Sequence, residues 1–178
     1  MGRQIELRLT GSGGQGLILG GIILAEAALN EGKNAIQSQS YGPEARGGAS
    51  KAEVIISDEE IDFPKVDKAD LLLSLTQAAF DKYCKTVKKD GILLIDSSVS
   101  VPDEFNYASI IQVPILATAC DVIGKPMVAN IIAVGIIQEL LNTVSKESLE
   151  AAVLRRVPKG TEELNQRALR EGYKLAKA

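Results

Sequence analysis

The sequence predicts an α/β domain of three layers, with helices covering both faces of a mostly parallel sheet. Three observations carry this prediction. Strand-like and helix-like segments alternate along the chain, two of the strand-like segments are short and continuously apolar, and the last third is helical. The 178 residues suffice for one domain, which we expect to span 1–178.

The first unit consists of a strand, a glycine-rich loop and a helix. Residues 3–10 alternate polar and apolar side chains, which predicts the strand, and 17–29 predict the helix. The helix has almost no polar face, so we expect it to be buried on all sides, within the domain or against another subunit. Gly20 and Gly21 each lower helix propensity by about 1 kcal/mol relative to alanine. Close packing against a neighbouring backbone would explain them.

The middle of the chain supplies the other strands. We expect strands over 34–38, 50–56, 71–75, 92–95 and 110–113, a helix over 77–88, and turns at 58–60 and 90–91.

The last third is predicted to contain three helices. Pro126 opens the first, which continues to Leu141. Ser145 caps the second, to about Arg156, and Thr161 caps the third, to about Lys177.

The composition excludes several kinds of active site. The chain has no histidine, which rules out a Ser-His-Asp triad, an imidazole base and histidine-ligated zinc. Its two cysteines, Cys84 and Cys120, cannot supply the four thiolates of an iron–sulfur cluster and are too far apart for a CxxC pair. Chemistry must therefore use backbone, carboxylate, Lys, Arg, Ser/Thr or Tyr groups, or be located on another chain.

The charge and hydropathy patterns predict where the protein works. A net charge of −3 and an isoelectric point near 5.2 argue against nucleic acid as a partner. The apolar runs are shorter than the roughly 20 residues that span a bilayer, and no signal peptide is visible. We expect a cytoplasmic protein with reduced thiols and no membrane partner.

The glycine-rich loop has the pattern G-x-G-x-x-G at Gly11, Gly13 and Gly16, between a strand and a helix. Such a loop allows close approach of the backbone, and the helix N-terminus attracts an anion. A dinucleotide site also needs a carboxylate about 20 positions on, at the end of the second strand. That strand end, 36–40, contains none, and the next carboxylate along the chain is Glu44. A nucleotide or phosphate site and a loop that only lets the helix pack close to the sheet both remain open.

A second unusual segment follows the predicted strand at 34–38. It contains three glycines, a proline, a tyrosine and a charge pair, for which a functional or interface role is favoured over an ordinary surface loop. The guanidinium of Arg46 would suit a carboxylate or phosphate. The residues concerned are Tyr41, Gly42, Pro43, Glu44, Arg46, Gly47 and Gly48.

These two segments, together with 95–98, resemble the gamma subunits of 2-oxoacid:ferredoxin oxidoreductases, with the greatest likeness to the 2-oxoglutarate enzymes. Asn130, Asn165 and the pair Gly172-Tyr173 also fit that family. The resemblance covers nearly the whole chain. It implies a Rossmann-like fold similar to domain III of pyruvate:ferredoxin oxidoreductase.

The resemblance further implies a complex that oxidatively decarboxylates a 2-oxoacid with coenzyme A and reduces ferredoxin. Thiamine diphosphate, Mg and iron–sulfur clusters would be carried by the alpha, beta and delta subunits, because this chain has neither the thiamine-diphosphate motif nor four cysteines. This chain would be inactive alone and hold no metal. Pyruvate, branched-chain oxoacids and indolepyruvate are alternative substrates. A free-standing dinucleotide-binding module and a pure assembly scaffold are the rival functions.

The candidate site consists of loops expected to share one rim of the sheet, at the carboxyl ends of its strands. We expect these loops to bind a cofactor or a neighbouring subunit, and we expect no catalytic residue among them. The candidates are Gly11, Ser12, Gly13, Gly14, Gln15, Gly16, Thr76, Gln77, Asp96, Ser97, Ser98 and Asn130, together with the seven residues of the second segment.

Replacing Arg46 by alanine tests the anion-binding role. In the assembled complex, Arg46→Ala should raise the apparent KM for coenzyme A or for the oxoacid, because a guanidinium that binds an anion is lost. Steady-state kinetics of the purified complex measure this, and unchanged kinetics with intact assembly would contradict the role.

Overall fold

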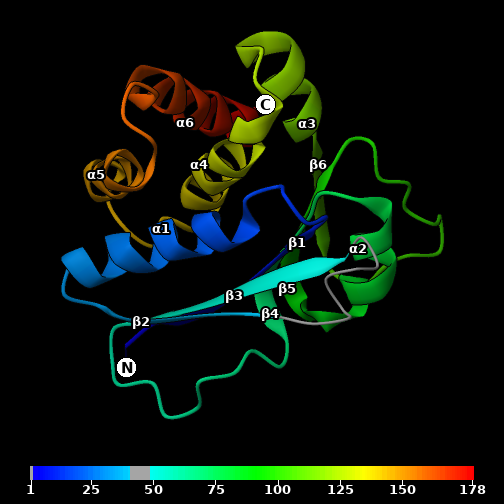
Figure 1. Ribbon diagram of the computed structural model, residues 1–178. Coiled ribbons are helices and arrows are strands. Elements are labelled where there is room, and N and C mark those ends of the chain that lie inside the picture. The colour runs from blue at the N-terminus through cyan, green and yellow to red at the C-terminus, as the bar shows by residue number, and fades with distance from the viewer. Residues whose placement is uncertain (1, 41–48) are drawn as a thin grey trace.

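The structure, a computed structural model that describes residues 2–40 and 49–178, is built on a six-stranded sheet (Figure 1). The strand order is β2-β3-β1-β4-β5-β6. The strands are β1 (Gln4–Gly11), β2 (Asn34–Gln39), β3 (Ser50–Ser57), β4 (Ala69–Ser74), β5 (Val87–Asp96) and β6 (Ser109–Val113). The predicted α/β class is confirmed.

One strand departs from the parallel arrangement. β1, β4, β5 and β6 pair in parallel, whereas β3 is antiparallel to both of its neighbours, β1 and β2. The connection from β2 to β3 is too short for the dozen or more residues that a parallel crossover needs, so the chain returns antiparallel.

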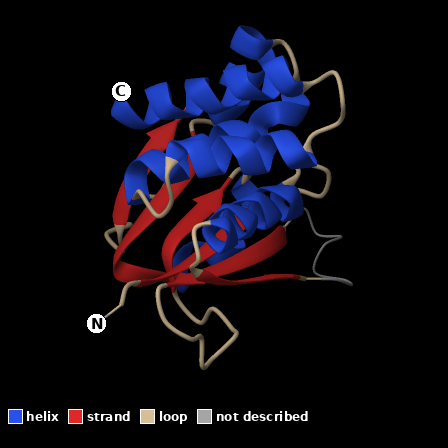
Figure 2. Ribbon diagram, turned by 90° about the vertical axis from the view of Figure 1, so that its left-hand side faces the viewer, coloured by secondary structure: helices blue, strands red, loops and turns tan. Residues whose placement is uncertain are grey.

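Helices crowd one face of the sheet (Figures 1 and 2). Leu7, Leu71 and Leu94 point from the strands into the main core, which these helices complete. The helix α1 lies along the sheet, while α5 and α6 pack over α1 and α4. The bounds are α1 (Leu17–Asn30), α4 (Ala129–Leu141), α5 (Lys146–Arg156) and α6 (Glu162–Lys177). In the described ranges, none of the helices is long and apolar enough to cross a membrane.

The opposite face is thinly covered. The short helix α2 (Gln77–Tyr83) packs Phe80 and Tyr83 against Leu72 and Leu93 of the sheet. Farther along, Ile55 packs with Val66 and Ala69, which belong to the segment joining β3 to β4 and to the start of β4. The three predicted layers are therefore present but uneven.

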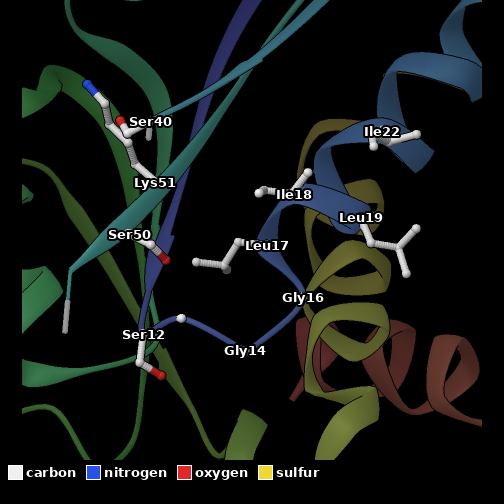
Figure 3. Close-up of a pocket in the computed structure, with 11 residues that line it drawn as sticks. Ser12, Gly14, Gly16, Leu17, Ile18, Leu19, Ile22, Ser40, Ser50 and Lys51 are labelled. Carbon is white, nitrogen blue, oxygen red and sulfur yellow. The ribbon is translucent and has the colours of Figure 1, made fainter. Parts of the chain in front are cut away.

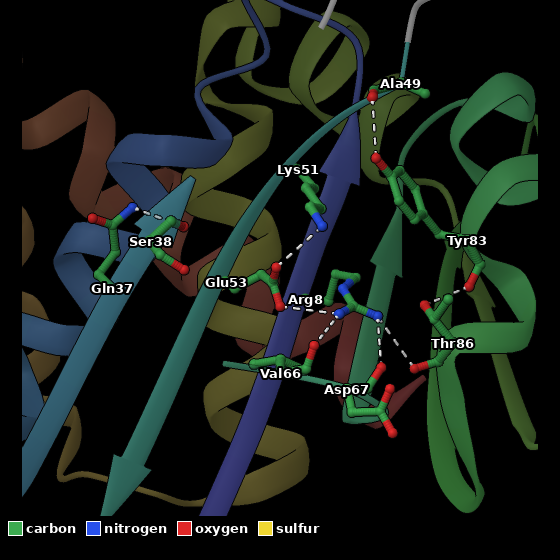
Figure 4. A network of polar contacts seen from close by, with 10 residues as sticks. All are labelled: Arg8, Gln37, Ser38, Ala49, Lys51, Glu53, Val66, Asp67, Tyr83 and Thr86. Carbon is green, nitrogen blue, oxygen red and sulfur yellow. Dashed lines mark hydrogen bonds and ion pairs between the residues drawn. The ribbon is translucent and has the colours of Figure 1, made fainter. Parts of the chain in front are cut away.

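A buried arginine holds that segment against the sheet (Figure 4). Arg8 on β1 is 4% exposed, and its guanidinium pairs with Glu53 at 3.0 Å and donates to Val66 O at 2.6 Å. It also donates to Asp67 O and, at the limit of hydrogen-bond length, to Thr86 O. A buried charge requires such partners, so Arg8 ties β1, β3 and the 58–68 segment together.

Two predicted boundaries were wrong in the region after β4. The expected helix over 77–88 ends at Tyr83, followed by the single turn η2 (Cys84–Thr86), and Val87 already belongs to β5. The expected turn at 90–91 lies inside β5, where the pairing with β4 is irregular. Gly91 is needed there because a Cβ would lie 2.8 Å from Asp70 O.

The helical third also differs in detail. Ser145 caps α5 as predicted, accepting from Ser148 N at 3.1 Å. Thr161 precedes α6 but does not cap it, since its hydroxyl donates instead to Pro158 O at 2.6 Å. Pro126 opens the first helix as predicted, because it begins the single turn η4 (Pro126–Val128), which continues into α4 and ends at Leu141. Short turns that the sequence did not predict lie before η4, namely α3 (Ile115–Ala117) and the π-helical η3 (Thr118–Ile123).

The helix α1 is only partly buried within this chain. Ile23 and Leu24 are fully buried, whereas Ile18 is 40% exposed and Leu29 is 55% exposed. The explanation offered for Gly20 and Gly21 was wrong. The nearest atoms to a Cβ there belong to side chains, at 3.4 Å from Val134 and 3.3 Å from Val54.

The close backbone contact lies instead where α4 crosses α6. A Cβ on Gly135 would lie 2.6 Å from Leu169 O and 3.2 Å from the Cα of Gly172, and a Cβ on Gly172 would collide with Ile132 O. Only glycine on both helices permits this separation, because a backbone carbonyl cannot move aside as a flexible side chain can.

Alanine substitutions test this crossing. Gly172→Ala should lower the free energy of unfolding by about 3 kcal/mol, at the upper end of overpacking costs, because the helices must separate. The matched control Gly20→Ala meets only ordinary contacts and should be neutral or stabilise the chain by up to about 1 kcal/mol. Urea unfolding of both variants measures the difference, and an equal effect would contradict it.

Candidate functional site

The structure brings three of the four predicted loops to one rim of the sheet. Gly11 at the end of β1 pairs with Ser50 at the start of β3, and Leu75 N donates to Thr10 O at 3.1 Å. At the end of β5, Ser97 N donates to Val113 O of β6 at 3.0 Å. The fourth loop lies outside the described residues, with its Tyr41, Gly42, Pro43, Glu44, Arg46, Gly47 and Gly48.

The last glycine of the loop is fixed by its conformation and by a neighbour. Gly16, the N-cap of α1, has φ +73°, a left-handed conformation that favours glycine. A Cβ there would also collide with the amide of Asn130. Asn130, on α4 and buried, donates to Gly16 O at 3.1 Å and accepts from Ile131 N at 2.9 Å. Asn130 is thus a structural partner of the loop.

The loop also satisfies part of its own hydrogen bonding. Ser12 N donates to Oε1 of Gln15 at 2.8 Å, so this side chain takes a position at which a ligand oxygen would accept. A Cβ on Gly11 would collide with the same oxygen. A side chain at 11 would therefore displace the Gln15 amide from Ser12 N.

The tip of the loop is different. Gly13 and Gly14 are exposed, and a Cβ on either would have no heavy atom within 4 Å. Gly14 has φ +86°, which favours glycine, whereas the φ of Gly13 lies outside the left-handed region. Within the described chain, neither space nor backbone conformation requires a glycine at 13.

A hollow of about 600 Å³ lies beside the loop (Figure 3). Its wall on the side of α1 is apolar, formed by Leu17, Ile18 and Ile22, and the strand side adds Ser50 and Lys51. The side chain of Lys51 extends away from the loop and pairs with Glu53 at 3.3 Å, on the face that holds Arg8 (Figures 3 and 4). The complete lining is Ser12, Gly13, Gly14, Gly16, Leu17, Ile18, Leu19, Ile22, Ser40, Ser50 and Lys51.

The other predicted rim residues hold their own loops. Buried Asp96 accepts from Ser98 N at 2.9 Å and from Leu116 N at 2.8 Å, which ties β5 to α3. Thr76 caps α2 by accepting from Ala79 N at 3.2 Å. The side chain of Gln77 accepts from Ser100 N at 2.8 Å and donates to Ser100 O at 3.1 Å, while Ser97 is exposed at the rim.

The sheet order argues against a dinucleotide site. In the usual fold the strand after the first helix lies next to the first strand and presents the carboxylate that binds ribose. Here β3 lies between β1 and β2, which moves the end of β2 about 5 Å farther away. Gln37 and Gln39 stand near that end, and their side chains bond to each other at 2.8 Å.

No cluster of three or more His, Cys, Asp or Glu side chains in 2–40 and 49–178 could hold a metal ion. Burial raises the pKa of the Cys84 thiol, the opposite of what a reactive cysteine requires. Within those ranges, the residues offer no carboxylate cluster for the magnesium that accompanies thiamine diphosphate.

Sequence reasoning missed the apolar wall of the hollow. The helix was expected to be buried on all sides, within the domain or against another subunit. Leu17 is buried within this chain, whereas Ile18 is 40% exposed and lines the hollow together with Ile22. The unbroken apolar character of α1 was the available signal. It did not indicate which side of the helix the chain itself would cover.

The fold and the rim define an α/β domain with a glycine-rich loop, whose strand order differs from that of a classical dinucleotide-binding fold. The model of the pyruvate ferredoxin/flavodoxin oxidoreductase family matches residues 6–175. The chain therefore belongs to this family.

Individual relatives agree with this assignment. The chain is 51% identical to "2-oxoglutarate synthase subunit KorC" of Methanocaldococcus jannaschii, over 97% of this chain and 94% of that one. A second similar protein is the keto/oxoacid ferredoxin oxidoreductase gamma subunit of Geobacter sulfurreducens, whose crystal structure matches this fold with a TM-score of 0.87. The two sequences are 49% identical, and the match covers 97% of this chain and 98% of that one.

A third relative shares the fold alone, at 20% identity and a TM-score of 0.88. It is the 2-oxoglutarate:ferredoxin oxidoreductase of Magnetococcus marinus, solved with 2-oxoglutarate, coenzyme A and succinyl-CoA bound. The match covers 98% of this chain but 31% of that one. The same fold therefore occurs there within a much longer polypeptide.

The contact between Gly16 and Asn130 can be tested by stability measurements. Gly16→Ala should lower the free energy of unfolding by about 2–3 kcal/mol, from the left-handed backbone and the collision with Asn130. In the double variant with Asn130→Ala, the loss of unfolding free energy should be smaller than the sum of the two single losses, because the collision is then removed. Gly13→Ala, the control, should leave stability unchanged or raise it by up to about 1 kcal/mol. Strictly additive effects in the double variant would contradict the contact.

Proposed function

We propose that this chain is the gamma subunit of a 2-oxoglutarate:ferredoxin oxidoreductase. The observation that carries the proposal is the 51% identity to a 2-oxoglutarate synthase subunit over nearly the full length of both chains. The reaction converts 2-oxoglutarate and coenzyme A into succinyl-CoA and carbon dioxide, and passes two electrons to ferredoxin with release of one proton.

In this proposal the reacting groups belong to other chains. Thiamine diphosphate supplies the carbanion chemistry when bound, and iron–sulfur clusters conduct the electrons, on alpha, beta and delta subunits. This chain has no histidine and two separated cysteines, in agreement with such a division. Its contribution is a rigid rim, with the glycine loop braced by Asn130 and the end of β5 braced by Asp96.

We place this rim beside the partner subunits, near the entrance for substrate and coenzyme A. The exposed tip at Gly13 and Gly14 and the apolar hollow next to it support this placement, because both face outward without a partner in the described chain that fills them. A ligand group or a partner backbone can approach the bare peptide groups of the tip closely.

The rival function, a free-standing dinucleotide-binding module, is tested on the isolated chain. Titration with NAD, NADP and flavins should give a Kd no lower than about 1 mM, equivalent to a binding free energy of about −4 kcal/mol. The reason is that β3 separates β1 from β2 and that β2 does not end on a carboxylate. Isothermal calorimetry measures it. A Kd near 1 μM for any of these ligands would favour the rival.

The principal experiment purifies the complex through a tag on this chain and measures ferredoxin reduction. We expect oxidoreductase chains to co-purify, with thiamine and iron present, and activity that requires coenzyme A. Reduction with 2-oxoglutarate should exceed that with pyruvate, branched-chain oxoacids and indolepyruvate by at least about tenfold in kcat/KM, equivalent to about 1.4 kcal/mol. Preference for another oxoacid would overturn the substrate assignment but leave the family in place.

A further inference from the structure

The exposed side of α1 carries an apolar strip. Ile18, Ile22 and Leu29 are spaced so that they fall on one side of the helix, and Ile18 and Leu29 are among the most exposed large apolar residues described. We call these three residues the α1 strip. Ile18 begins the strip beside the glycine loop (Figure 3), and Leu29 lies near the other end of α1.

Hollows flank the α1 strip on both sides. Ile18 and Ile22 line the hollow beside the glycine loop, and Ile22 and Leu29 line another that reaches Arg156. On the other flank, a hollow of about 250 Å³ lies among Leu19, Met127 and Pro158, and Met127 is 72% exposed. Because Leu19 and Ile22 each line two of these hollows, they form one continuous surface.

Few charged side chains line these hollows, namely Lys51, Glu26 and Arg156, and each is paired within the chain. Residues 17–25 contain no charged side chain. At the border, the carboxylate of Glu26 pairs with Arg155 at 3.1 Å and with Arg156 at 2.8 Å, so these charges are paired within the chain. An apolar centre with a charged rim is the usual composition of a protein–protein interface.

The tip of the glycine loop extends this surface. Gly13 has open space around it and no left-handed backbone, yet it is a glycine beside the α1 strip. A neighbouring chain that packs against its bare peptide would account for the missing side chain. The hollow, the strip and the tip then share one occupant.

We propose that the α1 strip and the loop tip bind another subunit of the same oxidoreductase, through an apolar, uncharged segment that projects into the flanking hollows. The inference rests on the proposed function. We commit to another subunit rather than to a second copy of this chain, since in the Magnetococcus protein the same fold makes up 31% of a longer polypeptide.

The experiment uses the tagged chain expressed in its own organism with the other subunits. Ile18→Glu and Leu29→Glu should each reduce incorporation into the complex at least tenfold, because a carboxylate is forced into an apolar contact. Gly13→Ala should reduce it more weakly. Val122→Glu is the matched control, since Val122 is 48% exposed on η3, and it should assemble like wild type.

The variants must retain the thermal stability of the isolated chain, which both exposed positions allow. Three results are decisive. If wild type recovers no oxidoreductase chains, the proposed function fails, and this inference fails with it. If wild type recovers them and the strip variants do so equally, or Val122→Glu loses them equally, the inference alone is overturned. If light scattering finds a wild-type dimer that Ile18→Glu dissociates, a second copy occupies the strip instead.

Discussion

The contact of Asn130 with Gly16 is the constraint that links the sheet, the glycine loop and the helical layer. It joins the first turn of α1 to α4, and its amide occupies the space that any side chain at 16 would need. The position of α4 thus sets where the loop turns. The tip at Gly13 and Gly14 projects outward as a consequence, so the same contact shapes the core and exposes the site.

Much of the fold was predictable, because local patterns determined it. The alternation in β1, the apolar runs of β4 and β5 and the cap at Ser145 are properties of a few neighbouring residues. The antiparallel direction of β3 was not predicted, although the short connection from β2 contained that information. The end of α2 and the start of β5 were misjudged because Asp90-Gly91 resembles a turn between a helix and a strand. Gly91 lies inside β5 instead, where its role is to permit close contact with β4.

The candidate site was predicted in position but not in character. The rim follows from strand direction, and the described loops meet there. That Gln15, Asp96 and Gln77 bond within the chain could not be read from residue types, because each is equally able to bind a ligand. The apolar hollow depends on which side of α1 is left uncovered, a property of α4 and α5 rather than of α1 itself.

Arg8 has a consequence for how the thin face moves. If the 58–68 segment lifted away, the carbonyls of Val66 and Asp67 would leave and a guanidinium would remain buried with fewer partners. Fraying residue by residue is therefore unfavourable, and we expect the segment to open as one cooperative unit with the neighbouring strands. The part of this face that α2 does not cover is thereby kept closed by the hydrogen bonds of one buried guanidinium and by the packing of Ile55 with Val66 and Ala69.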